Sequence, residues 1–155
     1  MRRMGLAALL TAGLIALGGC GDSGPSTRQV KGVVTYRGQP VAQAAVMFSP
    51  VKGGQGLPAA GQTNEAGEFS LWTGSKTGAA PGEYVVTVSK SELVPTGEKI
   101  PKPEGGMEDV MTTKDLLPPI YKLSTTSPLK VTVEAGKKNE YKFELEDSPQ
   151  QAPGQ

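Results

Sequence analysis

Alternation of apolar and polar residues at a period of two restricts the fold of this chain more than any other feature. Successive side chains of a β-strand point to opposite faces, so this period indicates strands with one buried face, as in antiparallel sheets. The alternating segments are 44–48 (AAVMF), 68–72 (EFSLW), 83–88 (EYVVTV), 129–134 (LKVTVE) and 140–146 (EYKFELE). The stretch 30–36 is expected to form a further strand and 59–63 a short one, which gives about seven short strands in all.

Turn residues separate these segments. The chain has 21 Gly and 13 Pro among 155 residues, well above the usual combined share of about 12%. We expect a tight turn at 37–40 (RGQP), a hairpin at 64–67 (NEAG) and a further hairpin at 135–139 (AGKKN) between the last two strands. Short strands joined by short turns over 28–146 predict a single antiparallel β-sandwich. Its core should contain Phe48, Phe69, Val86, Val131 and Phe143, which lie on the apolar face of their strands.

Three stretches of this region resemble carboxypeptidase regulatory-like domains: 32–48, 61–71 and 81–88, with weaker continuation at 117–121 and 127–131. The resemblance implies a transthyretin-like or immunoglobulin-like Greek-key sandwich that serves as an accessory module without catalytic residues. The related hydroxyisourate hydrolases use histidines and a Tyr-Arg-Gly-Ser end. The similar run 36–39 (YRGQ) lies at the first turn of a chain without His, and we interpret it as a turn.

The N-terminus has the pattern of a lipoprotein signal peptide. Arg2 and Arg3 precede an apolar run at 4–17, which as a helix spans about 21 Å and is shorter than the hydrocarbon core of about 30 Å. It therefore indicates a signal-peptide core rather than a membrane span. The run ends in Leu17, Gly18, Gly19 and Cys20, which resembles the lipobox that a signal peptidase recognises before the cysteine is acylated. A conventional secreted cysteine and an uncleaved short anchor are the alternatives.

These features divide the chain into four regions. We expect a signal peptide at 1–19, a lipidated flexible tether at 20–27, the sandwich at 28–146 and a disordered polar tail at 147–155 (DSPQQAPGQ). Two or three acyl chains anchor a protein stably, whereas one does so only marginally. The expected location is thus the cell envelope, with the exported protein held by lipid on Cys20 at the outer membrane or facing the periplasm, as a monomer.

Composition excludes several classes of function. The chain has no His and a single Cys, so it lacks Ser-His-Asp and Cys-His pairs, internal disulfides and the commonest zinc ligand. Lys and Arg number 16 against 15 Asp and Glu, which gives no basic patch for nucleic acid. We expect no enzymatic activity, no cofactor and no bound metal. The run 64–68 (NEAGE) has too few oxygen ligands for calcium, and a plain hairpin is favoured there.

The remaining candidates lead to one main interpretation and two alternatives. The main one is a lipid-anchored, non-catalytic structural or interaction module whose partner is an envelope protein or glycan. The first alternative is a carbohydrate-binding accessory module that uses Trp72 or Tyr121. Its position in the alternating pattern predicts that the Trp72 side chain points outward, although we favour its being covered by the 73–80 loop or by an edge of the neighbouring strand. A hydrolase that uses the carboxylates of 108–109 or 144–147 ranks third, because no cleft is indicated.

The stretch 91–119 is the longest without an apolar repeat and contains five prolines. Loops of more than about 12–15 residues are usually functional or disordered. Its charges are mixed in sign, so they indicate no particular ligand. We expect an irregular segment, disordered rather than formed into a site.

Overall fold

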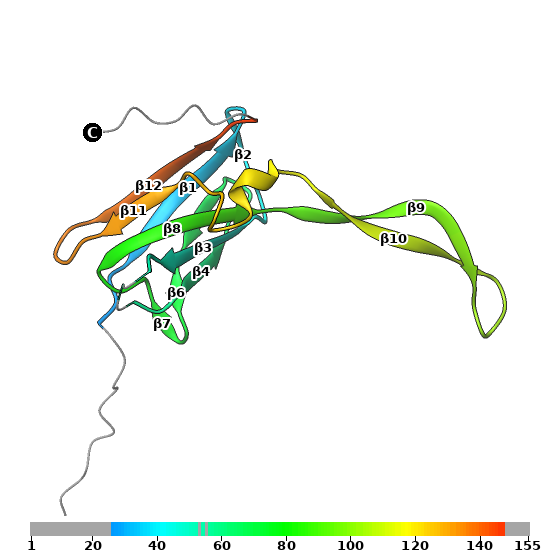
Figure 1. The fold of residues 1–155 in the computed structure, drawn as a ribbon, viewed down its shortest axis with the longest axis horizontal. Coiled ribbons are helices and arrows are strands. Elements are labelled where there is room, and N and C mark those ends of the chain that lie inside the picture. Colours follow the sequence, from blue (N-terminus) through cyan, green and yellow to red (C-terminus); the bar gives the residue numbers. More distant parts are fainter. Residues whose placement is uncertain (1–25, 53, 55, 148–155) are drawn as a thin grey trace, which may run out of the picture.

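Two β-sheets and a projecting two-stranded ribbon make up the fold (Figure 1). The computed structural model describes residues 26–52, 54 and 56–147. Sheet I contains β1 (Val30–Tyr36), β2 (Gln39–Pro40), β5 (Glu68–Ser70) and β12 (Asn139–Leu145). Sheet II contains, in spatial order, β11 (Lys130–Val133), β8 (Gly82–Ser89), β3 (Ala45–Pro50), β4 (Ala59–Gln62), β6 (Trp72–Thr73) and β7 (Lys76–Thr77). The ribbon pairs β9 (Ser91–Pro101) with β10 (Met107–Asp115), and a single 3-10 turn, η1, spans Pro119–Tyr121.

Phe48 lies at the centre of the core between the two sheets. Its ring centroid is 6.3 Å from that of Phe69 and 6.2 Å from that of Phe143, both from sheet I. Phe48, Phe69, Phe143 and Val86 are buried, and Val131 is half-buried against them. The predicted all-β sandwich and its five predicted core residues are therefore confirmed. The core is that of one continuous domain, because buried side chains of both sheets belong to the same cluster.

The turn at 37–40 also forms as expected. Arg37 and Gly38 have φ of 51° and 76°, and Tyr36 faces Gln39 across the β1–β2 pair. Two central residues with positive φ are typical of the type I′ turn of a two-residue hairpin. The run 36–39 therefore is a turn, as its position in the sequence predicted.

The other two expected hairpins are tight turns, but they connect the two sheets. At 64–67, the Asn64 N–H donates to the Glu68 carbonyl at 2.8 Å, yet β4 lies in sheet II and β5 in sheet I. At 135–139, β11 pairs with β8 while β12 pairs with β1. The Asn139 side chain holds this connection, since its Oδ1 accepts from the Glu134 N–H at 2.8 Å. Alternation reveals which face of a strand is buried, but it does not say which sheet the strand joins.

One pair differs from the expected antiparallel pattern. β12 runs parallel to β1, and the seven residues of β1 face Asn139 to Leu145 in order. The connection through sheet II returns the chain to the same end of sheet I, so the first and last strands point the same way. Within the described residues, all the other pairs of strands are antiparallel.

The expectation of an irregular or disordered segment at 91–119 is wrong. Residues 91–115 form the β9–β10 hairpin, which we call the arm, and Figure 1 shows it extending away from the two sheets. At about 3.3 Å per residue, the nine residues of β10 span about 30 Å. Both faces of the arm are open to solvent, so no one-sided burial imposes an alternating apolar pattern on its sequence. That absence of a pattern is what made it resemble a loop.

Candidate functional site

The arm concentrates the exposed apolar side chains of the molecule. Eight large hydrophobic residues are exposed in the described part of the chain, and four of them lie on the arm. Leu93 is 69% exposed and Met107 63%. No residue of 91–115 belongs to the core cluster. An isolated two-stranded hairpin is only marginally stable in water, so an exposed apolar ribbon of this length indicates an interaction surface. The other two arm residues in the exposed set are Ile100 and Met111.

Backbone hydrogen bonds at both ends of the arm show which backbone N–H and C=O groups of each strand point toward the other strand and which point to the free edge. At the base, the Leu116 N–H donates to the Lys90 carbonyl at 2.9 Å, and at the tip the Lys102 N–H donates to the Gly106 carbonyl at 3.0 Å. Consecutive residues of a strand direct their backbone groups to opposite edges. Counting from either end, the odd-numbered residues of β10, from 107 to 115, therefore direct N–H and C=O away from β9.

The same alternation of inward and outward backbone groups explains how β9 accommodates two prolines. Pro95 faces Met111 and Pro101 faces Met107, and each proline occupies a position whose backbone groups point away from β10. A proline lacks an N–H, so neither removes a hydrogen bond of the β9–β10 ladder. The extra residues of β9 form an irregularity opposite the Asp109–Met111 stretch, where Gly97 has a φ of 88°. Prolines therefore did not exclude a strand here.

Exposed ion pairs cross the arm. Lys99 Nζ lies 3.6 Å from an Asp109 carboxylate oxygen, and Lys114 Nζ lies 3.9 Å from Glu92. Both pairs are solvent-exposed and each stabilises the hairpin only weakly. At the base, Lys122 Nζ lies 2.9 Å from Asp115. Opposite charges along a strand can nevertheless select a partner and a register.

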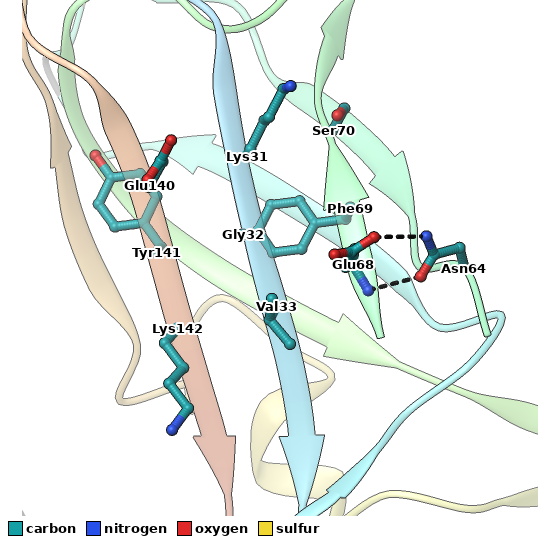
Figure 2. Close-up of a pocket in the computed structure, with 10 residues that line it drawn as sticks. All are labelled: Lys31, Gly32, Val33, Asn64, Glu68, Phe69, Ser70, Glu140, Tyr141 and Lys142. Carbon is teal, nitrogen blue, oxygen red and sulfur yellow. Dashed lines mark hydrogen bonds between the residues drawn. The ribbon is translucent and has the colours of Figure 1, made fainter. Parts of the chain in front are cut away.

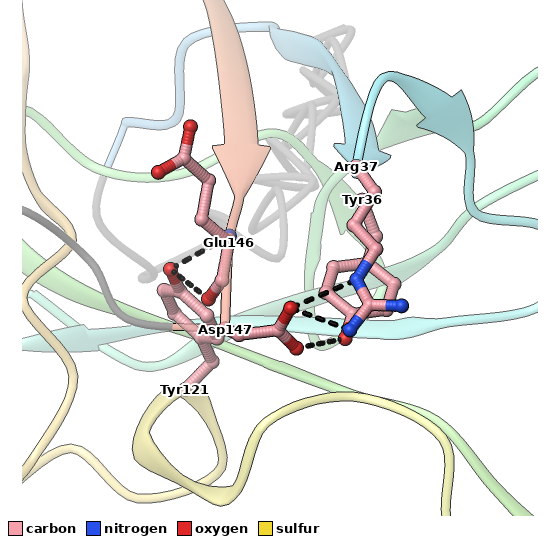
Figure 3. Close-up of polar contacts among 5 residues, drawn as sticks. All are labelled: Tyr36, Arg37, Tyr121, Glu146 and Asp147. Atoms are coloured by element: carbon pink, nitrogen blue, oxygen red, sulfur yellow. Dashed lines mark hydrogen bonds and ion pairs between the residues drawn. The ribbon is translucent and has the colours of Figure 1, made fainter.

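Tyr121, one of the two residues of the carbohydrate-binding alternative, lies in the core beside the base of the arm. It is 1% exposed. Its hydroxyl donates to the Glu146 carbonyl at 3.2 Å and accepts from the Glu146 N–H at 3.1 Å (Figure 3). A ring buried in this way offers no face for stacking on a sugar. Tyr121 instead ties the segment that follows the arm to the end of β12.

A polar cluster at the first turn holds the end of the chain that the structure describes. Asp147 accepts from the Tyr36 hydroxyl and, at 2.8 Å, from Arg37 Nε (Figure 3). The hydrogen bonds from Tyr36 and Arg37 lower the pKa of the Asp147 carboxyl, and the bond to Asp147 raises the pKa of Tyr36. The predicted tail begins at Asp147, but these contacts make this residue part of the folded domain. The rest of that predicted tail, 148–155, lies outside the described residues.

Trp72, the other residue of the carbohydrate-binding alternative, is exposed. Its parity predicted an outward side chain, and 53% of it is open to solvent. The expected covering by the 73–80 loop or by an edge of the neighbouring strand does not occur, because β7 pairs beside Trp72 in the plane of the sheet and leaves the ring open. The ring pairs described in the structure lie in the core and do not include Trp72. It is a lone exposed ring.

The outer face of sheet I carries an open groove that the sequence did not indicate. It has a volume of about 510 Å³, and side chains from β1, β5 and β12 surround it (Figure 2). Lys31 faces Glu140 across β1 and β12, and Glu68 faces Val33 on the other side. Acidic and basic groups alternate around the groove, so it has no net preference for either charge. Such a surface lacks the converging polar groups of a small-molecule site.

The remaining candidate sites are structural or lie outside the described residues. Asn64 Oδ1 accepts from the N–H groups of Ala66 and Glu68 at 3.0 and 2.9 Å, which commits this oxygen to the turn rather than to calcium. The described part of the chain holds no group of three or more acidic, His or Cys side chains suited to a metal, and none of its helical structure is long and apolar enough to cross a membrane. Leu17, Gly18, Gly19 and Cys20 lie outside the described residues.

Comparisons of the chain with protein-family models, with curated proteins and with solved structures found no match.

Proposed function

We propose that this protein is a lipid-anchored, non-catalytic interaction module of the cell envelope. In this proposal acylated Cys20 holds the protein to a membrane, and the arm contacts a protein partner. The observation that carries it is the arm itself, an exposed hairpin of about 30 Å. It presents Leu93, Ile100, Met107 and Met111 to solvent and contributes nothing to the core.

The anchor supports the same function. The run 17–20 resembles a lipobox, and Cys20 is the only cysteine of the chain. In this proposal the predicted tether 20–27 would have a root-mean-square reach of roughly 15 Å, which would lift the sandwich just clear of the lipid headgroups. A module held this close to a membrane needs a projecting element to reach another envelope component, and the arm is such an element.

Photo-cross-linking tests the role of the arm. A photoreactive amino acid replaces Met107, on the arm, or Leu123, which is 57% exposed but lies outside the arm. In cells that produce the full chain, the probe at position 107 should give defined covalent products with protein, and the probe at position 123 should not. The absence of products from position 107, or the same products from both positions, would reject the arm as the contact surface.

Trp72 supports a second candidate, a carbohydrate-binding accessory module. Its ring is the one large exposed aromatic side chain of the described residues, and aromatic faces stack on sugars and form protein hot spots. With Tyr121 buried, Trp72 alone supports this candidate. Retention of the protein on cell-wall glycan that is lost in Trp72→Ala, and unaffected when the arm is shortened, would favour this function over the first.

A further inference from the structure

The two strands of the arm differ in what their free edges offer to another strand. Among the outward positions of β9, Pro95 and Pro101 lack an N–H, and the bulge around Gly97 interrupts the edge. Prolines and bulges are devices that protect edge strands from pairing. β10 reads MEDVMTTKD and has neither Pro nor Gly. All five of its outward positions carry an N–H and a C=O, so β10 is the edge of the arm that can accept a further strand.

The sequence of β10 is complementary to itself in antiparallel orientation. If two copies of β10 align with Met111 opposite Met111, every residue of the nine-residue strand has a partner. Odd-numbered residues then face odd-numbered residues, so the outward N–H and C=O groups of both strands meet. Glu108 faces Lys114 of the second copy, and by symmetry Lys114 faces Glu108. Val110 faces Thr112 on the same side of the sheet.

Charge selects this register over its neighbours. Pairing by the same edge groups also permits registers in which the two-fold axis passes through a residue one or two positions away from Met111. Centring on Thr112 places Asp109 opposite Asp115, and centring on Asp109 places Asp109 opposite itself. Like charges directly opposite each other destabilise a pair of strands, and opposite charges stabilise it. Centring on Val110 avoids repulsion but loses both Glu108–Lys114 contacts. The register centred on Met111 has two attractive charge pairs and no repulsive one.

Self-pairing also gathers part of the exposed apolar surface of the arm onto one face of a wider sheet. Met111 of the two copies meets on the axis, and Leu93 and Pro95 of the adjoining β9 strands lie on the same face, because cross-strand partners share a face. The isolated hairpin becomes a four-stranded antiparallel sheet, and three or more strands are what independent stability requires.

We propose that two copies of this protein associate through their arms, with β10 pairing antiparallel to β10 about Met111. This inference rests on the proposed function of the arm and names its partner as a second copy of the chain. It replaces the monomer expected from the sequence. The pairing is isologous and closed, so it gives dimers rather than filaments.

Disulfide trapping in the envelope of cells that produce the full chain tests the register. Facing residues in a hydrogen-bonded antiparallel pair have Cα atoms about 5.5 Å apart, within the range of about 4.4–6.8 Å that a disulfide spans. M111C should therefore give a covalent dimer under oxidation. T113C is the matched control on the same strand and face, because the two copies of position 113 are about 13 Å apart along the strands. Equal trapping at both positions, or none at position 111, would overturn the register.

Charge exchange tests the pairing without a new covalent bond. Two full-length copies with different affinity tags are produced together, and recovery of the second tag with the first is measured. E108K alone and K114E alone should each weaken self-association roughly tenfold, because each places two like charges opposite each other. A copy with E108K and a copy with K114E should pair with each other, since both contacts are then Lys–Glu. Unchanged recovery in the single variants, or no rescue in the mixed pair, would refute self-pairing.

The photo-cross-linking products separate this inference from the proposed function. Products from position 107 that contain two copies of the chain support both proposals. Products that contain only another protein support the interaction module and reject the dimer. The absence of any product rejects both.

Discussion

The hydroxyl of Tyr121 is bonded to both backbone groups of Glu146, accepting from its N–H at 3.1 Å and donating to its C=O at 3.2 Å. Twenty-five residues separate the two along the chain. Tyr121 is the last residue of η1, which follows the arm, and Glu146 comes directly after the end of β12. A single hydroxyl therefore fixes the end of β12 against the segment through which the arm returns to the sandwich.

Removing this hydroxyl should loosen that junction. Tyr121→Phe keeps the buried ring but leaves two backbone groups of Glu146 without their partner, and we expect it to lower the free energy of unfolding by about 1–2 kcal/mol. Urea denaturation measures the change. Tyr141→Phe is the matched control, because the Tyr141 hydroxyl donates to the Thr132 carbonyl at a solvent-exposed position. A loss in the control as large as that at Tyr121 would contradict the assignment.

The Asp147 contacts should make stability depend on pH in acid. The pKa of Asp147 is lower in the folded protein than in the unfolded chain, where an aspartate has a pKa of about 3.9. The unfolded state therefore binds more protons in acid, and the stabilisation is complete above about pH 4 and lost as the pH falls through the folded pKa. Thermal melts should show Asp147→Asn less stable than the wild type at pH 7 and equally stable at strongly acidic pH. A difference that persists in acid would exclude the carboxylate as its cause.

The parity of β5 predicts unequal effects at neighbouring residues. Phe69 is 3% exposed and stacks on Phe143 at 6.0 Å between ring centroids. Phe69→Ala should cost roughly 3–5 kcal/mol, enough to unfold a domain of ordinary stability. Glu68 is exposed on the other face, and Glu68→Ala should change the free energy of unfolding by less than about 0.5 kcal/mol. Similar melting temperatures for the two variants would show that the strand faces are misassigned.

Shortening the arm should leave the sandwich intact. Residues 94–112 contribute no side chain to the core cluster, and each halving of a loop changes stability by only about 0.6 kcal/mol. Replacing them with a four-residue Gly-Ser turn between Leu93 and Thr113, which face each other, should keep the melting temperature close to that of the full chain. A large fall in melting temperature would show that the arm supports the sandwich.

The alternating segments predicted strand faces well, because burial on one side is a local property that each segment records. Val86, Phe48 and Phe143 are buried as their parity indicates. The turn at 37–40 was equally predictable, because Gly38 readily adopts the positive φ that a tight turn requires, whereas the positive φ of Arg37 could not be inferred from its residue type.

Other features depend on partners that are distant in the sequence. Nothing in β12 itself distinguishes a parallel partner from an antiparallel one, so its pairing with β1 could not be predicted. The groove over Val33 and Lys142 arises from three strands that meet only in the folded protein. Asp147 begins a polar stretch that has the composition of a tail, and only its contacts with Tyr36 and Arg37 make it part of the fold.

The parallel pairing of β1 and β12 determines how the domain responds to mechanical force. The start of β1 lies next to the tether and Asp147 follows the end of β12, so these two points stand at opposite ends of one ladder. A pull between them slides the strands along each other and loads all seven residue pairs at once, whereas an antiparallel pair would open one bond at a time. A protein held to a membrane at its N-terminus would therefore resist tension applied at its C-terminus through shear of its central ladder.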